Sequence, residues 1–161
     1  MNKKEAPLQA LETYLPQGAF EHISKYLIRH KVHLTITRER SSILGNYQGA
    51  YNGQNHRISV NGNLNKYSFL ITLIHELAHL HTYEKHGTRI TAHGSEWKRE
   101  YSKLLTIFVS QKIFPADVED ELLSTIKSPS ASSCTEVSLL RVLRKYDPPK
   151  PGVFLLEDLP E

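Results

Sequence analysis

The sequence predicts an α+β fold, in which a small three-stranded antiparallel sheet packs on one long helix and further helices flank it. Two segments, 32–38 and 56–61, alternate apolar and polar side chains as half-buried strands do. Residues 67–74 form a dense apolar run that leads into a longer helical segment. Apolar side chains then recur at helical spacing from Trp97 to Val109. These three observations define the fold class.

The N-terminal part of the chain is predicted to be mainly helical. Residues 8–30 carry a break at 16–18, where a proline and a glycine interrupt the pattern. Beyond the break, apolar side chains recur every three or four residues, as at Phe20, Ile23 and Leu27. We therefore expect a helix that packs one face against the rest of the domain.

Three short strands are predicted after this helix. The middle one, 45–51, carries Gly45 and Gly49 and is therefore predicted to be an edge strand or a bulged one. The pair Asn52-Gly53 is the signal of a tight hairpin turn into the last strand. An edge strand can hold an extended peptide by main-chain pairing, or it can be a plain border of the sheet. The sequence favours neither.

Capping residues indicate where the later helices begin and end. The long helix is predicted to start at a cap, Asn63 or Asn65, and to stop at Gly87. Ser95 is the predicted cap of the next helix. A shorter acidic helix is predicted over residues 115–126, with a proline at its start.

We expect one domain over residues 1–127, followed by a linker and a helical or extended tail over 128–161 that packs on it or is partly flexible. The apolar runs are shorter than the ~18 residues of a membrane span, and the basic N-terminus is not followed by a signal-peptide pattern. With one cysteine, Cys134, the chain forms no internal disulfide, so the cytoplasm is the expected compartment.

The segment His75-Glu76-Leu77-Ala78-His79 is typical of a metal site. Each helical residue turns by ~100°, so His79 returns to within about 40° of His75, one turn further along. Both imidazoles can then bind one ion, and Glu76 can reach a water molecule on that ion without being a ligand. This is the arrangement of two histidines and one base found in zinc peptidases. Two core histidines are the alternative, but such a polar patch is costly to bury without partners.

A catalytic zinc ion needs a third protein ligand beside an open position for water. His93 follows a return loop and precedes Gly94, which lets the backbone approach the first helix closely. Glu100 would give a site of two histidines and one glutamate instead. His86 is a further candidate at the end of the first helix. Glu96 could be a ligand only if the second helix were rotated. The residues alone favour His93 over Glu100 and leave the alternatives open.

The motif is followed, after a short connection, by the segment His93-Gly94-Ser95-Glu96-Trp97-Lys98. The two together resemble the SprT-like metalloprotease family, best over residues 20–110. The family's second motif is a His-Gly pair followed by an aromatic residue and a lysine, which this segment matches. The resemblance implies a small zincin-like domain with Zn2+ as cofactor, His75, His79 and His93 as ligands and Glu76 as the base. Many members also carry a cysteine-rich zinc ribbon, which a chain with one cysteine cannot build.

The resemblance implies a zinc-dependent endopeptidase with a protein substrate, and eukaryotic relatives cut proteins crosslinked to DNA. A net charge of +3 permits contact with DNA without requiring it, and no membrane partner is expected. Two other functions remain open, a zinc-stabilised nucleic-acid or transcription-associated binding protein without proteolytic activity and a zinc hydrolase of nucleic acid. Trp97 is expected to be a packing residue that supports the loop of His93. The sequence leaves the oligomeric state open.

Overall fold

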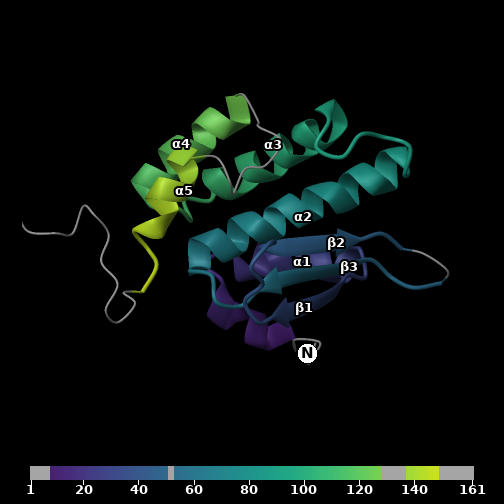
Figure 1. Cartoon of the computed structure of the whole chain (residues 1–161), viewed down its shortest axis with the longest axis horizontal. Helices are drawn as coiled ribbons and strands as arrows, with labels where there is room; N and C mark the ends of the chain where they lie inside the picture. Colours follow the sequence, from purple (N-terminus) through teal and green to yellow (C-terminus); the bar gives the residue numbers. More distant parts are fainter. Residues whose placement is uncertain (1–7, 51–52, 128–136, 149–161) are drawn as a thin grey trace, which may run out of the picture.

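A three-stranded sheet and the helices around it make up an α+β fold, which confirms the predicted class. The computed structural model describes residues 8–50, 53–127 and 137–148. In chain order the elements are η1 (Leu8–Tyr14), α1 (Phe20–Arg29), β1 (His33–Thr37), β2 (Gly45–Gln48), β3 (Arg57–Asn61), α2 (Lys66–His86), α3 (Ser95–Ser110), α4 (Ala116–Lys127) and α5 (Val137–Arg144). Helix α2 lies between the sheet on one side and α3, α4 and α5 on the other (Figure 1).

The sheet is mixed rather than purely antiparallel. Its strand order is β1-β3-β2. β2 pairs antiparallel with β3, from Gly45 opposite Val60 to Gln48 opposite Arg57, whereas β1 runs parallel to β3. The predicted antiparallel arrangement is therefore wrong for the β1–β3 pair, because alternating side chains indicate the buried face of a strand and not the direction of its neighbour. The predicted edge position of the glycine-bearing strand is confirmed.

The regular pairing between β2 and β3 ends at Gln48 and Arg57. Gln54 forms an isolated bridge beyond it, and the predicted tight turn at Asn52-Gly53 stays a prediction. Asn52 lies outside the described residues. Gly53 has a φ of 77°, a conformation that glycine adopts without steric cost.

Helix α2 is buried on nearly every side because other elements cover two of its faces. A helix in this position needs apolar side chains around its whole circumference, which explains why the sequence shows a dense apolar run here instead of a stripe. A polar group on this helix is therefore unusual, and Glu76 is only 5% exposed. The apolar side chains of α2 that are fully buried are Phe69, Leu70, Ile71, Leu73, Ile74, Leu77, Ala78 and Leu80.

Specific side-chain and backbone features set both ends of α2. The Oδ1 atom of Asn65 accepts hydrogen bonds from two backbone N–H groups of the first turn, at 3.1 and 2.9 Å, so Asn65 and not Asn63 is the cap. The Asn65 amide also donates to the Leu143 carbonyl oxygen at 3.0 Å and to Asp147 Oδ1 at 2.6 Å, which ties α5 to the start of α2. At the other end, Gly87 follows the last helical residue with a φ of 72°, as predicted.

The remaining helices follow the predicted stretches with differences at their ends. Residues 8–14 form a 3-10 helix, and α1 begins after the predicted break. Helix α3 begins at Ser95, but its cap position is Gly94 and no side chain caps it, so the predicted capping role of Ser95 is wrong. Helix α5 packs on α4 and buries Leu139 and Leu143.

The division into a domain over residues 1–127 and a tail over 128–161 stays a prediction. Residues 128–136, which include Cys134, and residues 149–161 lie outside the described residues. None of the helices in the described part of the chain combines the length and the apolar character that a membrane crossing needs.

Replacing Asn65 by alanine is expected to destabilise the protein by roughly 1–2 kcal/mol, because α2 loses its cap and α5 loses its anchor. The free energy of unfolding in urea measures this. Asn63→Ala is the matched control, because Asn63 is an exposed asparagine close by in the chain, and its loss should change stability by less than ~0.5 kcal/mol. Equal effects of the two substitutions would contradict the assignment of the cap.

Candidate metal centre

Three histidine side chains point at a common centre. The Nε2 atom of His93 lies 3.1 Å from Nε2 of His75 and 3.0 Å from Nε2 of His79. The ligand atoms of the three residues lie within 4.8 Å of one another, and this is the only such group that the described residues contain. Two ligands bound tetrahedrally to zinc at typical distances would lie about 3.3 Å apart. The spacing of the three nitrogen atoms therefore suits a single metal ion.

Two local backbone features bring the three rings together. His75 and His79 lie one turn apart on α2. His93 lies in a turn in which the Gly94 N–H donates to the Thr91 carbonyl oxygen at 3.0 Å. Its φ of 58° is in the left-handed region, where histidine is more frequent than most residues. A methyl group on Gly94 would lie 3.0 Å from the Thr91 oxygen, so glycine permits the tight turn that presents His93 to α2.

Trp97 packs against all three imidazoles. It is fully buried, and its ring centroid lies 4.7 Å from those of His75 and His93 and 5.4 Å from that of His79. Its indole N–H donates to the His75 carbonyl oxygen at 3.4 Å, and Tyr101 stacks on the indole with centroids 4.8 Å apart. The expected packing role of Trp97 is confirmed, although it contacts all three rings and not only that of His93.

Burial keeps the three imidazoles neutral. It lowers the pKa of His75 to about 3 and that of His79 to about 4, with neighbouring imidazoles adding to both shifts, and it also lowers the pKa of His93. Neutral rings offer the lone pairs that metal ligands need. The Nε2 atom of His93 faces the Nε2 atoms of both other histidines, so three possible ligand atoms converge on one place. A cation would satisfy all three lone pairs, so the residues fit a metal ion.

Glu76 lies beside the three histidines and is buried with them. Its Oε1 atom is 4.0 Å from Nε2 of His75, and its Oε2 atom is buried without a hydrogen-bond partner among the described residues. Burial raises the pKa of Glu76 to about 8, and the charge of Arg40 opposes this shift. A buried oxygen atom without a hydrogen-bond partner is costly. A cation or a water molecule at the histidines would supply the partner that Oε2 of Glu76 lacks.

Arg40 is a neighbour of the site that the sequence analysis did not single out. Its Nε donates to Asn61 Oδ1 at 2.7 Å, and its Nη1 donates to Ser59 Oγ at 3.0 Å. These contacts fix the guanidinium group at the end of β3, from where its charge lowers the pKa of Glu76. No local pattern connects Arg40 with Glu76, so only the fold reveals the pair.

The alternative ligands lie away from the centre. Glu100 is buried, but its carboxylate pairs with Lys85 of α2. Neither Glu96 nor His86 belongs to the group of converging ligand atoms. The structure therefore brings His93, the residue favoured by spacing, to the two histidines of α2, while the role of the three as ligands stays a prediction.

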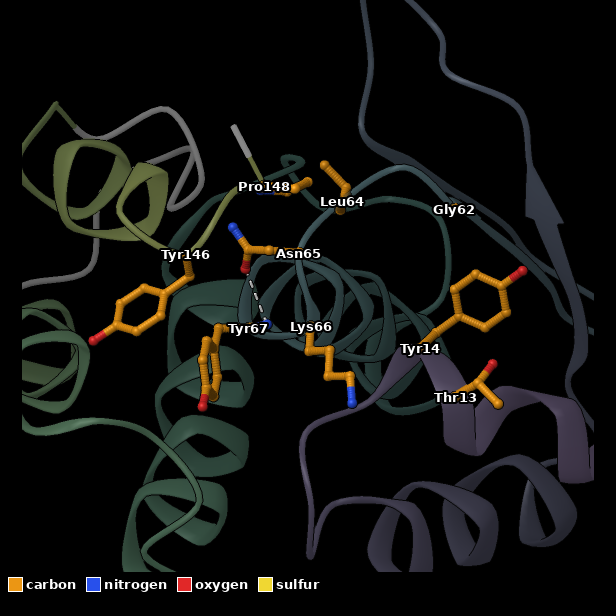
Figure 2. A pocket seen from close by; sticks show the side chains of 9 residues that line it. All are labelled: Thr13, Tyr14, Gly62, Leu64, Asn65, Lys66, Tyr67, Tyr146 and Pro148. Carbon is orange, nitrogen blue, oxygen red and sulfur yellow. Dashed lines mark hydrogen bonds between the residues drawn. The ribbon is translucent and has the colours of Figure 1, made fainter. Parts of the chain in front are cut away.

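A separate pocket of about 460 Å³ lies at the N-terminal end of α2 (Figure 2). In this view Tyr67 and Tyr146 lie on one side, Tyr14 on the other and Lys66 between them. Lys66 precedes His75 by about 14 Å along the helix axis, so the pocket is distinct from the metal centre. Its lining consists of Thr13, Tyr14, Gly62, Leu64, Asn65, Lys66, Tyr67, Tyr146 and Pro148.

His93→Ala is expected to weaken Zn2+ binding by roughly 100-fold or more, because the ion loses one of three protein ligands. Zinc content after dialysis and competition with a coloured chelator measure the loss. His86→Ala is the matched control, because His86 is an exposed histidine at the end of α2, and it should bind zinc like the unaltered protein. Full zinc content in His93→Ala would show that His93 is not a ligand.

Comparison with known families gives one finding. The sequence model of the SprT-like family matches residues 17–120. This segment runs from just before α1 into α4 and contains the three histidines and Glu76. Comparisons with curated proteins and with solved structures gave no match. Because the family model covers more than half of the 161 residues, the chain belongs to the SprT-like family.

Proposed function

We propose that the protein is a zinc-dependent endopeptidase of the SprT-like type. The observation that carries the proposal is the position of Glu76 next to three converging imidazoles, with a buried Oε2 atom that has no hydrogen-bond partner among the described residues. A purely structural metal site has no use for a base at this place, whereas hydrolysis needs one. Family membership supports the proposal, because SprT-like proteins are typically zinc metallopeptidases.

In the proposed reaction His75, His79 and His93 hold the ion and Glu76 moves the proton. Bound zinc would supply a Lewis acid that polarises the scissile carbonyl group and acidifies the attacking water. Glu76 accepts a proton from that water and returns it to the leaving amine. Gly45 lies so close to Glu76 that a methyl group on it would be 3.3 Å from Glu76 Cγ. This close contact leaves the carboxyl group little room to turn away from the histidines.

The open edge of β2 supports binding of an extended peptide. The Asn61 N–H donates to the Leu44 carbonyl oxygen at 2.8 Å, so residues 44 and 61 are a hydrogen-bonded pair. Because such pairs alternate in an antiparallel ladder, the main-chain groups of Gly45 and Tyr47 face away from β3. β2 is the last strand of the sheet. An added substrate strand would therefore pair with these two residues, which suits sequence-tolerant binding.

We extend the proposal to DNA-associated proteins as substrates. Its support is the family resemblance and a net charge of +3, which favours approach to an anionic polymer. The competing function is a zinc-stabilised nucleic-acid or transcription-associated binding protein without proteolytic activity. Cleavage assays with and without double-stranded DNA separate the two functions.

Glu76→Gln should lower kcat for cleavage of an unfolded protein such as casein by roughly 100-fold or more, because the amide cannot accept the proton. Zinc binding should be retained, since Glu76 is not proposed as a ligand. Fluorescent casein and zinc titration measure the two effects.

Glu96→Gln is the matched control, because Glu96 lies near the second motif but outside the converging group. It should cleave casein at the rate of the unaltered protein. Equal activity in Glu76→Gln would remove the proposed mechanism. An unaltered protein that binds zinc and DNA but cleaves neither casein nor a DNA-bound protein would favour the competing function.

A further inference from the structure

Strand β2 and the residue that follows it pack closely on α2 at two glycines. A methyl group on Gly45 would lie 2.7 Å from Thr72 Cγ2, and one on Gly49 would lie 3.0 Å from the ring of Tyr83. Alternate residues of a strand lie about 6.6 Å apart, close to the ~5.4 Å rise of one helical turn. The segment therefore follows α2 turn by turn, and Tyr47 is the large side chain between the two glycines.

Tyr47 lies against the imidazole of His79. Their ring centroids are 6.4 Å apart and their planes differ by 10°, an offset-stacked arrangement. Trp97 is a second ring nearly parallel to that of His79, with centroids 5.4 Å apart and planes 29° apart. These two rings come from β2 and α3, which lie on opposite sides of α2 (Figure 1).

Tyr47 is itself held at its hydroxyl group. This group is hydrogen-bonded to Nδ1 of His56 at 2.8 Å, and the two rings stack with centroids 5.9 Å apart. His56 is buried, and its carbonyl oxygen accepts the His33 N–H at 2.8 Å, which anchors it to β1. A continuous path of contacts therefore runs from the sheet through His56 and Tyr47 to His79.

We propose that Tyr47, held by His56, is a positioning residue that fixes the orientation of the His79 imidazole toward the metal ion. The ring torsion of a histidine is broad, so an unsupported ring samples many orientations. The aromatic plane of Tyr47 restricts this rotation, and less side-chain freedom is lost when the ion binds. The inference rests on the metal-binding part of the proposed function and is independent of proteolysis.

Zinc affinity of variants at Tyr47 tests the inference. Tyr47→Leu, which removes the ring, should weaken Zn2+ binding by about 10–100-fold, the usual effect of losing a residue that orients a metal ligand. Tyr47→Phe keeps the ring and loses the hydroxyl group, so a smaller loss is expected. His56→Phe should weaken Zn2+ binding by the same factor as Tyr47→Phe. The double variant should weaken it by no more than either single substitution, because both substitutions remove the same hydrogen bond.

The matched control is Tyr14→Leu, because Tyr14 is also half-buried and stacks on α2, on Phe69 with centroids 5.4 Å apart. It should leave zinc affinity within about twofold of the unaltered protein, since it is remote from the histidines. The visible absorption of the Co2+-loaded protein should change in Tyr47→Phe and not in Tyr14→Leu.

The outcomes decide the role of Tyr47. The positioning role would be overturned if both Tyr47 variants bound Zn2+ like the unaltered protein. It would also be overturned if Tyr47→Leu and Tyr14→Leu lost Zn2+ affinity equally. If Tyr47→Leu does not fold, the affinity and the Co2+ spectrum of Tyr47→Phe decide, and unaltered values would overturn it. Loss of casein cleavage with normal zinc binding in Glu76→Gln concerns the peptidase alone. Absence of zinc binding in the unaltered protein would refute the metal centre itself.

Discussion

The contact of Trp97 with three imidazoles is the interaction on which the rest of the site depends. The indole is fully buried and touches His75, His79 and His93 at once. It thereby joins α2, which supplies two of the rings, to the turn before α3, which supplies the third. The turn of His93 is held by the hydrogen bond from the Gly94 N–H to the Thr91 carbonyl oxygen, and the contact with Trp97 fixes the ring of His93 beside the two rings on α2.

Burial is the main cause of the shifted pKa values at the centre. Removal from water disfavours the charged form of any group, so it lowers the pKa of the histidines and raises that of Glu76. The result is a cluster of neutral groups whose ring nitrogen atoms face one another. A divalent cation reverses this situation, because it binds the lone pairs and stabilises the carboxylate at the same time. Arg40, held by Asn61, acts on Glu76 in the same direction from the sheet.

The sheet, η1 and the described residues that follow α5 support the site through their contacts with α2. β2 lies close to the helix at Gly45, as does Gly49 just after the strand, and this places the edge strand alongside Glu76 and His79. Outside the part of the chain that matches the family, residues of η1 and of the segment after α5 line one pocket at the start of α2. There Asn65 bonds to Asp147, and Tyr14 and Tyr146 line a pocket. The helix that carries the histidines is therefore held at its start as well as along both faces.

The sequence by itself determined the features that depend on neighbouring residues. The shared face of His75 and His79, the nearness of Glu76 and the stop at Gly87 follow from helical geometry and capping, which act over four residues or fewer. The strand direction, the contacts of Trp97 with three rings and the path from His56 through Tyr47 were decided only by the tertiary structure. These depend on which distant segments share a buried surface, and side-chain periodicity contains no information about that choice.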